Sequence, residues 1–423
     1  MLNWLFLDMN SFFASCEQHD DPSLRGRPVG VCPVLAGGGA VIAASYDAKA
    51  RGVGMGCRAA EARRLCPDIE LRQARPARYV EIHRLVMKSI ERHLPITKTW
   101  SIDEWALRLI GDERQPDTAV QIARRIKRQV AEDFRGALPC SVGIAPSRLL
   151  AKAACECRKP DGLTVITLAD LPDALSSMKL NDLPGVGSGM DARLRRADVD
   201  TVAKLWALSR ADCRRIWGSV QGEYFWSGLH GVDPVMPAER RRSMGHAHIL
   251  PPQYRTPGGA HAILTRLLCK AAVRLREHGY FAHGLRVHVA LESKRSWCAE
   301  IALPGVQDTP TLLQHLGRLW ARRPAALRSA DDGLPGAEPT ADTPKKVGVD
   351  VGGLTAAAAT PGHLFPQADR PRRLSHALDA INRKVRTRSG RHAIYPGTMA
   401  PVAGYVMDDK IAFGRIPEES LAM

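Results

Sequence analysis

Stretches with strand spacing and stretches with helical spacing alternate over the first 165 positions. An apolar run at 2–7 has the length of a strand and ends at Asp8, and residues 11–18 have helical character. The remaining pattern predicts strands at 27–33, 40–45 and 96–109 and helices at 46–50, 77–94 and 118–134. Alternation of this kind predicts a layered α/β or α+β structure over residues 1–165.

The pattern changes twice beyond residue 165. Residues 171–233 contain short helical stretches broken by glycine turns and no convincing strand, which predicts a small all-α domain. After a charged connector at 240–242, the order strand, helix, strand, strand, helix, strand is predicted for 243–249, 258–277, 284–292, 297–303, 310–322 and 345–353. This βαββαβ order is typical of a ferredoxin-like sheet.

Two later segments are biased in composition. Residues 325–344 and 354–373 are rich in Ala, Asp, Gly and Pro, so both are predicted to be loops or linkers. One amphipathic helix is predicted at 374–384 within the C-terminal segment.

The size and charge of the chain restrict its function. Its 423 residues correspond to about two to four domains. Sixty Lys and Arg against 44 Asp and Glu give a formal charge of +16, which favours a polyanionic partner. The hydrophobic share of 45% and charged share of 25% are those of a folded globular protein.

The sequence shows no feature of a membrane or secreted protein. No run approaches the roughly 18 apolar residues that a bilayer span needs, and the apolar start of the chain is too short for a signal peptide. Ten scattered cysteines without a C-x-x-C pair fit neither a zinc ribbon nor a disulfide framework. A cytoplasmic protein is expected.

Three carboxylates are candidates for cation binding. Asp8 ends a strand, and Asp103 and Glu104 are adjacent within a second apolar stretch. Oxygen ligands of this kind suit Mg²⁺. A regular strand would send Asp103 and Glu104 to opposite faces, and neither Gly nor Pro marks a bend there. From the residues alone, a solvated acidic pair is the more common interpretation.

Other candidates are weak by themselves. Phe12 and Phe13 would ordinarily be core residues. Tyr46 and Lys49 lie one helical turn apart and could hold phosphates, but a solvated helix face is the usual alternative. The lysines at 152 and 159 are likewise ambiguous, although Lys159 precedes a turn.

The glycine-rich segment 183–187 (LPGVG) is more specific. A turn of this composition between two short helices exposes backbone N–H groups that can bind a phosphate without reading sequence. This predicts a helix-hairpin-helix element at Gly185, Val186 and Gly187, with a purely structural turn as the alternative.

Taken together, these motifs resemble those of the Y-family translesion DNA polymerases. The resemblance covers residues 1 to about 355 and rests on 7–17 (LDMNSFFASCE), 46–56 (YDAKARGVGMG), 101–104 (SIDE), 141–144 (SVGI), 151–152 (AK), 158–160 (RKP) and 183–187 (LPGVG). Each motif is modest support, but their shared order and spacing are specific.

The resemblance implies an α+β multidomain fold shaped like a right hand. Residues 1–10 and 76–165 would be a ferredoxin-like palm, 11–75 small fingers, and 166–235 an all-α helix-hairpin-helix thumb. A linker at 236–242 would lead to a βαββαβ little finger at 243–353, followed by a linker and C-terminal extension at 354–423.

The resemblance also implies roles for individual residues. Asp8, Asp103 and Glu104 would hold two Mg²⁺ ions, with the backbone carbonyl of Met9 as a further ligand. Phe13, beside Phe12, falls at the steric-gate position that excludes a ribose 2′-hydroxyl. The remaining expected contacts are Tyr46, Lys49 and Lys159 to the triphosphate, Lys152 to the triphosphate or DNA, and Gly185, Val186, Gly187, Arg240, Arg241 and Arg242 to DNA.

The subfamily stays open. Many members carry Arg at the position of Lys49 and Thr at the position of Ala43. Lys49 and the segment 378–382 resemble the polymerase V branch, whereas Tyr46 resembles the polymerase IV branch.

The expected activity is template-directed, low-fidelity DNA synthesis opposite damaged bases, within a bacterial response to DNA damage. Primer-template DNA and deoxynucleoside triphosphates are the expected partners, with accessory subunits or a recombinase as further candidates and the nucleoid as the expected location. Leu364 and Phe365 are the two apolar anchors of a candidate sliding-clamp peptide. The alternative is an inactive polymerase-like protein that binds DNA and recruits partners, although such relatives typically lose the acidic triad.

Overall fold

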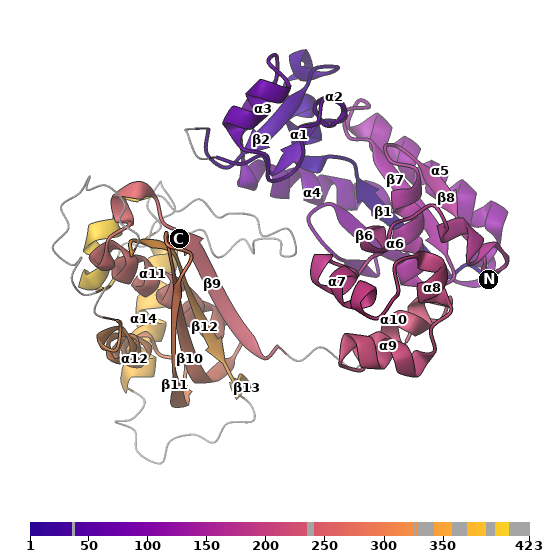
Figure 1. The fold of residues 1–423 in the computed structure, drawn as a ribbon. Coiled ribbons are helices and arrows are strands. Elements are labelled where there is room, and N and C mark those ends of the chain that lie inside the picture. Colours follow the sequence, from indigo (N-terminus) through magenta and orange to yellow (C-terminus); the bar gives the residue numbers. More distant parts are fainter. Residues whose placement is uncertain are drawn as a thin grey trace. The chain divides into compact units, whose positions relative to one another are not determined.

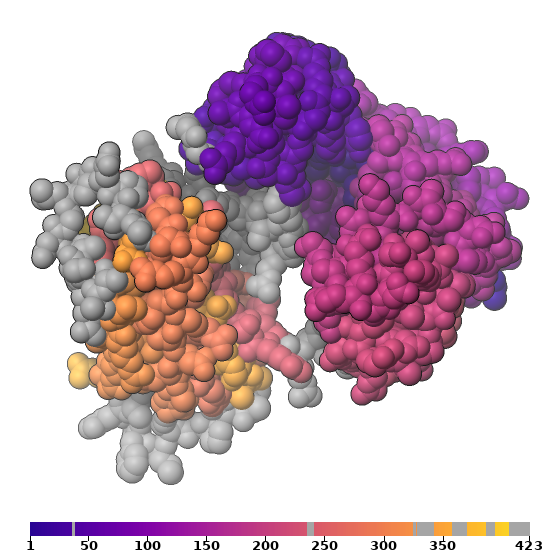
Figure 2. All heavy atoms as spheres, in the orientation of Figure 1, coloured from indigo at the N-terminus to yellow at the C-terminus, as the bar shows by residue number. Residues whose placement is uncertain are grey.

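The computed structural model describes residues 1–35, 39–234, 241–324, 327, 342–357, 370–385 and 394–405. The described residues form two compact units, one before residue 235 and one after residue 240. Figures 1 and 2 draw the first unit from indigo to pink and the second from red to yellow. In the described part of the chain, no helix is long and apolar enough to cross a membrane.

A five-stranded sheet is the centre of the first unit. Its strands lie in the order β5 (Lys98–Thr99), β6 (Glu104–Arg108), β1 (Trp4–Met9), β7 (Cys140–Ala145) and β8 (Leu163–Val165). β1 is antiparallel to both β6 and β7, and β8 is parallel to β7. All residues of β1 and β7 are buried, since helices cover both faces of the sheet.

The two faces of this sheet carry different helices. Leu5 and Leu7 belong to one core with α1 (Phe12–Asp20), α4 (Pro76–Glu91) and α5 (Pro116–Asp133). Trp4 and Phe6 belong to another core with α6 (Arg148–Cys157). Because side chains alternate along a strand, Asp8 lies on the same face as Trp4 and Phe6, under α6.

One glycine brings α6 close to the sheet. A Cβ atom on Gly143 of β7 would lie 2.0 Å from the Ala151 carbonyl oxygen and 2.4 Å from the Cys155 nitrogen, both in α6. Only a residue without a Cβ permits this contact. The glycine therefore sets the height of α6 above the carboxylate end of β1.

A small subdomain follows α1. It contains a three-stranded sheet and two short helices, namely β2 (Val29–Cys32), β3 (Ala43–Ala44), β4 (Glu70–Gln73), α2 (Tyr46–Ala50) and α3 (Ala59–Leu65). The Ser45 hydroxyl caps α2 by accepting a hydrogen bond from the Ala48 N–H. The strand predicted at 40–45 is shortened to two residues.

Residues 166–234 form only helices and turns, as the pattern predicts. The helices are α7 (Ser188–Arg196), α8 (Val202–Trp206), α9 (Arg210–Trp217) and α10 (Gln221–Leu229), and the short 3-10 turns include η3 (Leu168–Asp170), η4 (Asp173–Leu175) and η5 (Leu180–Asp182). The Ser147 hydroxyl donates to the Gly228 carbonyl at 2.5 Å, which joins the start of α6 to α10. Phe225 and Leu229 share a core with α6.

The second unit confirms the βαββαβ order. Its elements are β9 (Ser243–Ile249), α11 (Pro257–Glu277), β10 (Tyr280–Leu291), β11 (Ser296–Val306), α12 (Thr309–Ala321) and β12 (Pro344–Gly352). The strands lie in the order β11-β10-β12-β9, all antiparallel, and β13 (Thr355–Ala356) pairs with the start of β10. In Figure 1, α11 and α12 lie on one face of this sheet.

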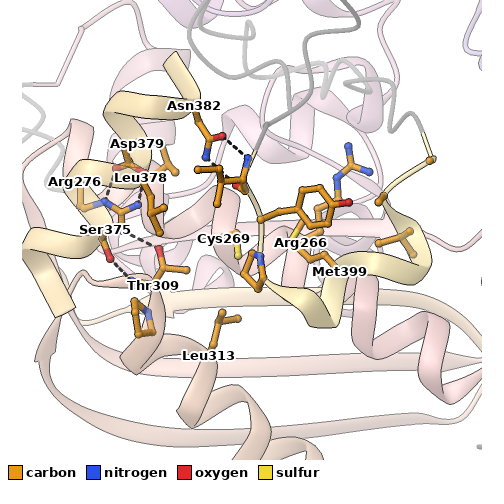
Figure 3. Close-up of a pocket in the computed structure, with 18 residues that line it drawn as sticks. Arg266, Cys269, Arg276, Thr309, Leu313, Ser375, Leu378, Asp379, Asn382 and Met399 are labelled. Carbon is orange, nitrogen blue, oxygen red and sulfur yellow. Dashed lines mark hydrogen bonds and ion pairs between the residues drawn. The ribbon is translucent and has the colours of Figure 1, made fainter. Parts of the chain in front are cut away.

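The C-terminal extension packs on the helices of the second unit. Helix α14 (Arg370–Lys384) begins four residues before the predicted start, and η9 (Gly397–Val402) follows it. Asp379 accepts two hydrogen bonds from the buried Arg276 guanidinium, at 2.6 and 2.8 Å. Figure 3 shows this ion pair beside a largely apolar cavity of about 710 Å³ between α11, α12 and the extension.

Candidate active site

Asp8 and Glu104 lie directly opposite each other on neighbouring strands. They are register partners of β1 and β6, which run antiparallel. Glu104 lies two positions from Ala106, which shares the core of Phe6 and α6. Both carboxylates therefore lie on the face that α6 covers, and Asp8 is only 7% exposed.

Asp103 reaches the same place because the chain bends before β6. The predicted strand at 96–109 is interrupted at 101–103, and β6 begins only at Glu104. The Ser101 hydroxyl donates to the Asp103 carboxylate and accepts from the Asp103 N–H. The Met9 N–H donates to the Asp103 carbonyl at 2.9 Å, which fixes the bend next to β1. A serine two positions ahead of the aspartate marks this bend, so neither Gly nor Pro is required.

Two lysines provide the counter-charges. Lys159 Nζ lies 2.9 Å from an oxygen of Asp8 and 2.7 Å from Glu156. Lys152 Nζ donates to both oxygens of Glu104 at 2.7 and 2.9 Å. Lys152 projects from α6, and Lys159 follows the C-terminal end of that helix.

Burial disfavours the ionised form of Asp8 and of Asp103. Burial raises the pKa of Asp8 to about 7, although the Lys159 ammonium lowers it, and the neighbouring Asp103 carboxylate raises it further. Burial also raises the pKa of Asp103. Additional positive charge at this point would favour the ionised forms.

Hard oxygen donors in a site short of positive charge fit divalent cations. In the part of the chain that the structure describes, no three His, Cys, Asp or Glu side chains are arranged to hold a metal ion as they stand. The reason is visible at Glu104 and Asp8, whose oxygens face Lys152 and Lys159 instead.

Helix α2 brings Tyr46 and Lys49 to the same region. Lys49 Nζ donates to the Ser11 hydroxyl at 2.9 Å and lies 4.3 Å from the centre of the Tyr46 ring. Burial and then the nearby charge of Lys159 lower the pKa of Lys49. The two ammonium groups are therefore close enough to repel each other, as expected of groups that await an anion.

Phe12 and Phe13 are both 3% exposed and belong to the core beneath β1. The Phe13 ring stacks on Tyr79 of α4, with 4.6 Å between ring centres and 17° between their planes. The Tyr79 hydroxyl in turn donates to Glu17 at 2.7 Å. Phe13 is thus held rigidly two residues beyond Ser11, the partner of Lys49.

Asn10, Ser141 and Lys127, to which sequence reasoning assigned no role, hold the Lys159 loop. The Asn10 side-chain oxygen accepts from the Asp161 N–H at 2.7 Å and from the Ser141 hydroxyl at 3.1 Å. Lys127 Nζ donates to the Asp161 carboxylate at 2.7 Å and to the carbonyls of Cys140 and Asp161 at 2.6 Å. Asn10 lies within the 7–17 motif and Ser141 within the 141–144 motif, but Lys127 carries no local sequence signal because Asp161 is 34 positions away.

The glycine hairpin lies close to α6. Gly185 has a φ of +91°, Val186 is buried, and Gly187 precedes the first turn of α7. These residues and Lys152 and Glu156 line a cavity of about 670 Å³. The first unit therefore places this predicted DNA-binding turn next to the helix that carries Lys152.

Some predicted site residues lie outside the described residues, namely Arg240, Leu364 and Phe365. Arg241 and Arg242 immediately precede β9, and the Arg242 side chain is exposed. The Arg242 carbonyl accepts a hydrogen bond from the Leu354 N–H at 3.5 Å.

Comparison with known proteins points to one family. A model described as "impB/mucB/samB family" matches residues 7–156, and the model of that family's C-terminal domain matches residues 241–364. The chain is 32% identical over 417 residues to DNA polymerase IV of Moorella thermoacetica, covering 95% of this chain and 96% of the relative. It is 30% identical over 414 residues to DNA polymerase IV of Pelotomaculum thermopropionicum, covering 96% and 97%.

Solved structures agree on the fold. A Y-family DNA polymerase chimera of Dbh and Dpo4 aligns with a TM-score of 0.68 at 22% identity, covering 84% of this chain and 100% of that chain. An insertion ternary complex of Dbh DNA polymerase aligns with a TM-score of 0.54 at 21% identity and the same coverage. The first unit and the second unit thus have the folds of a known multidomain architecture.

Proposed function

We infer from the combined sequence and site that this chain, which belongs to the impB/mucB/samB family of Y-family DNA polymerases, is a DNA-directed DNA polymerase of the translesion type. The observation that carries this function is the placement of Asp8 opposite Glu104, with Asp103 in the bend at 101–103 that immediately precedes Glu104. An inactive relative would have no need to keep three buried or half-buried carboxylates beside two lysines. The inactive alternative is therefore not favoured.

We propose that Asp8, Asp103 and Glu104 hold two Mg²⁺ ions, with the Met9 carbonyl as a further ligand. Such ions would activate the primer 3′-hydroxyl and neutralise charge on the leaving pyrophosphate. The raised pKa of Asp8 and the upward shift at Asp103 support this assignment, since burial disfavours the charged form of both carboxyls and Lys159 offsets this only in part. Lys152 and Lys159 supply that charge in part and must release oxygens of Glu104 and Asp8 when cations bind.

The fingers and palm would bind the incoming deoxynucleotide between them. Lys49 and Lys159 offer positive charge to the triphosphate, and Tyr46 offers a hydroxyl. Lys49 acts as a point charge, without the two-pronged geometry that Arg would provide. The rigid Phe13 ring would exclude a 2′-hydroxyl by occupying its space, which selects deoxyribose over ribose.

Low fidelity is expected from the small fingers. Among the described residues of the segment between α1 and α4, the regular elements are the short β2, β3, β4, α2, α3 and one 3-10 turn, which leaves little structure to close over a new base pair. Selection by induced fit is therefore weak, and distorted template bases are tolerated.

Primer-template DNA would extend from this site along the glycine hairpin. Gly185, Val186 and Gly187 would bind a backbone phosphate through their N–H groups, and Arg241 and Arg242 would contact DNA at the start of the second unit. Leu364 and Phe365 remain a proposed clamp-binding pair on sequence grounds alone, as do accessory subunits.

Replacing Asp103 by Asn tests the function. Asp103→Asn should reduce Mg²⁺-dependent primer extension by at least 10³-fold, because an amide is a poor ligand for Mg²⁺. The Kd for primer-template DNA, measured by fluorescence anisotropy, should change less than about twofold. The exposed Asp112 of the same unit supplies the matched control Asp112→Asn, which should extend primers normally. Persistent extension by Asp103→Asn would refute the cation assignment.

A further inference from the structure

A group of aromatic and basic side chains lies at the outer edge of the first sheet. Lys98 Nζ lies 4.5 Å and the Arg148 guanidinium carbon 5.0 Å from the centre of the Trp100 ring. Trp100 remains 37% exposed although it is a large aromatic residue. Lys98, Trp100 and Arg148 are here called the edge platform.

The guanidinium of Arg148 is available for a ligand. Among the described residues, its side chain makes no hydrogen bond or ion pair, and it lies over the rings of Trp100 and Trp4, the latter at 5.6 Å. The Arg148 backbone N–H donates to Asp233 at 3.0 Å, which leaves the guanidinium donors unused. The neighbouring Arg108, by contrast, is paired with Asp233 at 3.2 Å. An arginine held in place by two aromatic rings with its donors unused is suited to bind phosphate.

The edge platform is directly connected to the carboxylates. The Trp100 N–H donates to the Glu104 carbonyl at 2.9 Å, and Trp100 immediately precedes the serine that positions Asp103. Arg148 begins α6, and Lys152, which binds Glu104, lies one turn later on the same face. The edge platform is therefore joined to the carboxylates through the 100–104 bend and through α6.

The order of the strands indicates whether the triphosphate or the primer terminus lies on the side of the edge platform. Lys159 precedes β8 and pairs with Asp8 of β1. Lys98 and Trp100 of the platform lie in and next to β5, on the other side of β1, and Arg148 of α6 lies over Trp100. Phosphoryl transfer places the attacking and leaving oxygens roughly in line, on opposite sides of the reacting phosphorus. With the triphosphate on the Lys159 side, the primer terminus must approach from the side of β6 and β5.

We propose that the edge platform binds the primer strand just behind its 3′ end. Arg148 and Lys98 contact backbone phosphates, and Trp100 packs against an adjacent deoxyribose. This inference rests on the proposed polymerase function and assigns one of its two DNA strands to a surface. Its contacts carry no base information, which suits a polymerase that must extend primers of any sequence.

The first test measures DNA affinity in variants that keep the catalytic groups. Arg148→Gln should raise the Kd for a primer-template duplex about five- to tenfold at 0.1 M salt. It should also reduce the slope of log Kd against log salt by about 0.9, the value for one phosphate contact. The control Arg125→Gln removes one exposed charge from α5, which covers the other face of the sheet, and should change neither quantity as strongly.

The second test separates a DNA contact from a structural one. Trp100→Ala should weaken binding about threefold or more, and Trp100→Phe should restore most of the affinity, because a smaller ring still packs on a sugar. Lys98→Gln, on an edge strand, gives an independent variant if Arg148→Gln unfolds. Unchanged Kd and salt slope in both Arg148→Gln and Lys98→Gln, with folded protein by circular dichroism, would overturn the proposal.

The third test identifies the strand. Neutral methylphosphonates are placed singly at the last four linkages of the primer, and at the opposite linkages of the template. A contacted linkage should weaken wild-type binding but have no further effect in Arg148→Gln, as a double-mutant cycle across the interface requires. Coupling to a template linkage instead would refute the primer assignment.

These outcomes are separable from the polymerase function itself. Wild-type protein that binds duplex DNA without extending primers would contradict the proposed function and leave the platform contact measurable by affinity. Wild-type protein that extends primers while Arg148→Gln shows wild-type affinity and salt slope would contradict only the platform.

Discussion

At the scale of single residues, the main feature of the candidate active site is its buried carboxylates. Burial raises the pKa values of Asp8 and Asp103, and the Lys159 ammonium offsets part of their charge. A buried carboxylate costs free energy unless a group of opposite charge is bound beside it. The site is thus suited to bind positive charge. Phe13 is held in position by its own burial in the core that contains Leu5 and Leu7.

Phe13 is the residue whose replacement should change sugar selectivity. Phe13→Ala should raise the ratio of ribonucleotide to deoxynucleotide incorporation by roughly tenfold or more, because the ring no longer fills the space of a 2′-hydroxyl. Sugar selectivity is measured as the ratio of the kcat/KM values for an rNTP and the dNTP with the same base.

Loss of a buried aromatic also costs about 3–5 kcal/mol of stability, so thermal unfolding must accompany the kinetics. Phe13→Leu serves as the control that retains bulk. Unchanged sugar selectivity in a folded Phe13→Ala protein would reject the gate role.

His83 should make the stability of the protein depend on pH. Its ring is buried, stacks on Trp105 at 5.1 Å, and its Nδ1 lies 2.6 Å from the Ile102 carbonyl. Burial lowers the pKa of His83 below its ordinary 6.5. Below pH 6.5 the unfolded chain takes up a proton that the folded chain does not, so this contribution is present above pH 6.5 and lost as pH falls.

The variant His83→Asn removes the titration while its amide can still donate to Ile102. The free energy of unfolding in urea should therefore fall less between pH 7.5 and 5.5 in this variant than in the wild type. The exposed His376 provides the comparison His376→Asn. Parallel pH profiles for wild type and His83→Asn would show that the histidine plays no such role.

At the scale of elements, the packing of α6 on β7 positions most of the site. This helix carries Lys152, precedes Lys159, begins with Arg148 and faces the glycine hairpin. Gly143 permits its close approach, and the Ser147 hydroxyl ties its start to α10.

Gly143→Ala should therefore damage both stability and catalysis. The new Cβ would lie 2.0 Å from backbone of α6, so the helix must move and Lys152 must move with it. We expect a loss of about 1–3 kcal/mol in the free energy of unfolding, with a fall in kcat of more than tenfold. Gly54, at which a Cβ would meet no atom within 4 Å beyond its chain neighbours, supplies the control Gly54→Ala. Equal stability and activity of the two variants would contradict this account of α6.

At the scale of the whole molecule, the net charge of +16 is the leading property. It predicts that primer-template affinity falls steeply with salt. Neutralising about six phosphates would lower the affinity by roughly 10³-fold between 50 and 200 mM salt. Anisotropy titrations over this range measure the slope, and a slope near zero would exclude backbone phosphates as the main DNA contacts.

Sequence and tertiary structure each account for a distinct part of this protein. The period of the apolar residues predicts the strand that ends at Asp8, the all-α segment and the βαββαβ unit, because local spacing decides which side chains share a face. Spacing also predicts a regular strand through Asp103, and there it is wrong, since a serine side chain competes with the backbone and bends the chain.

The sequence by itself determined the carboxylates, the lysines and the glycine hairpin as candidates, since each lies in a short recognisable motif. Only the tertiary structure decided that Asp8 faces Glu104, that Lys127 anchors the Lys159 loop, and that Arg148 lies on Trp100. Partners separated by 34 to 96 positions leave no mark in local spacing. They meet because packing of the sheet and α6 brings distant segments together, and only coordinates reveal that packing.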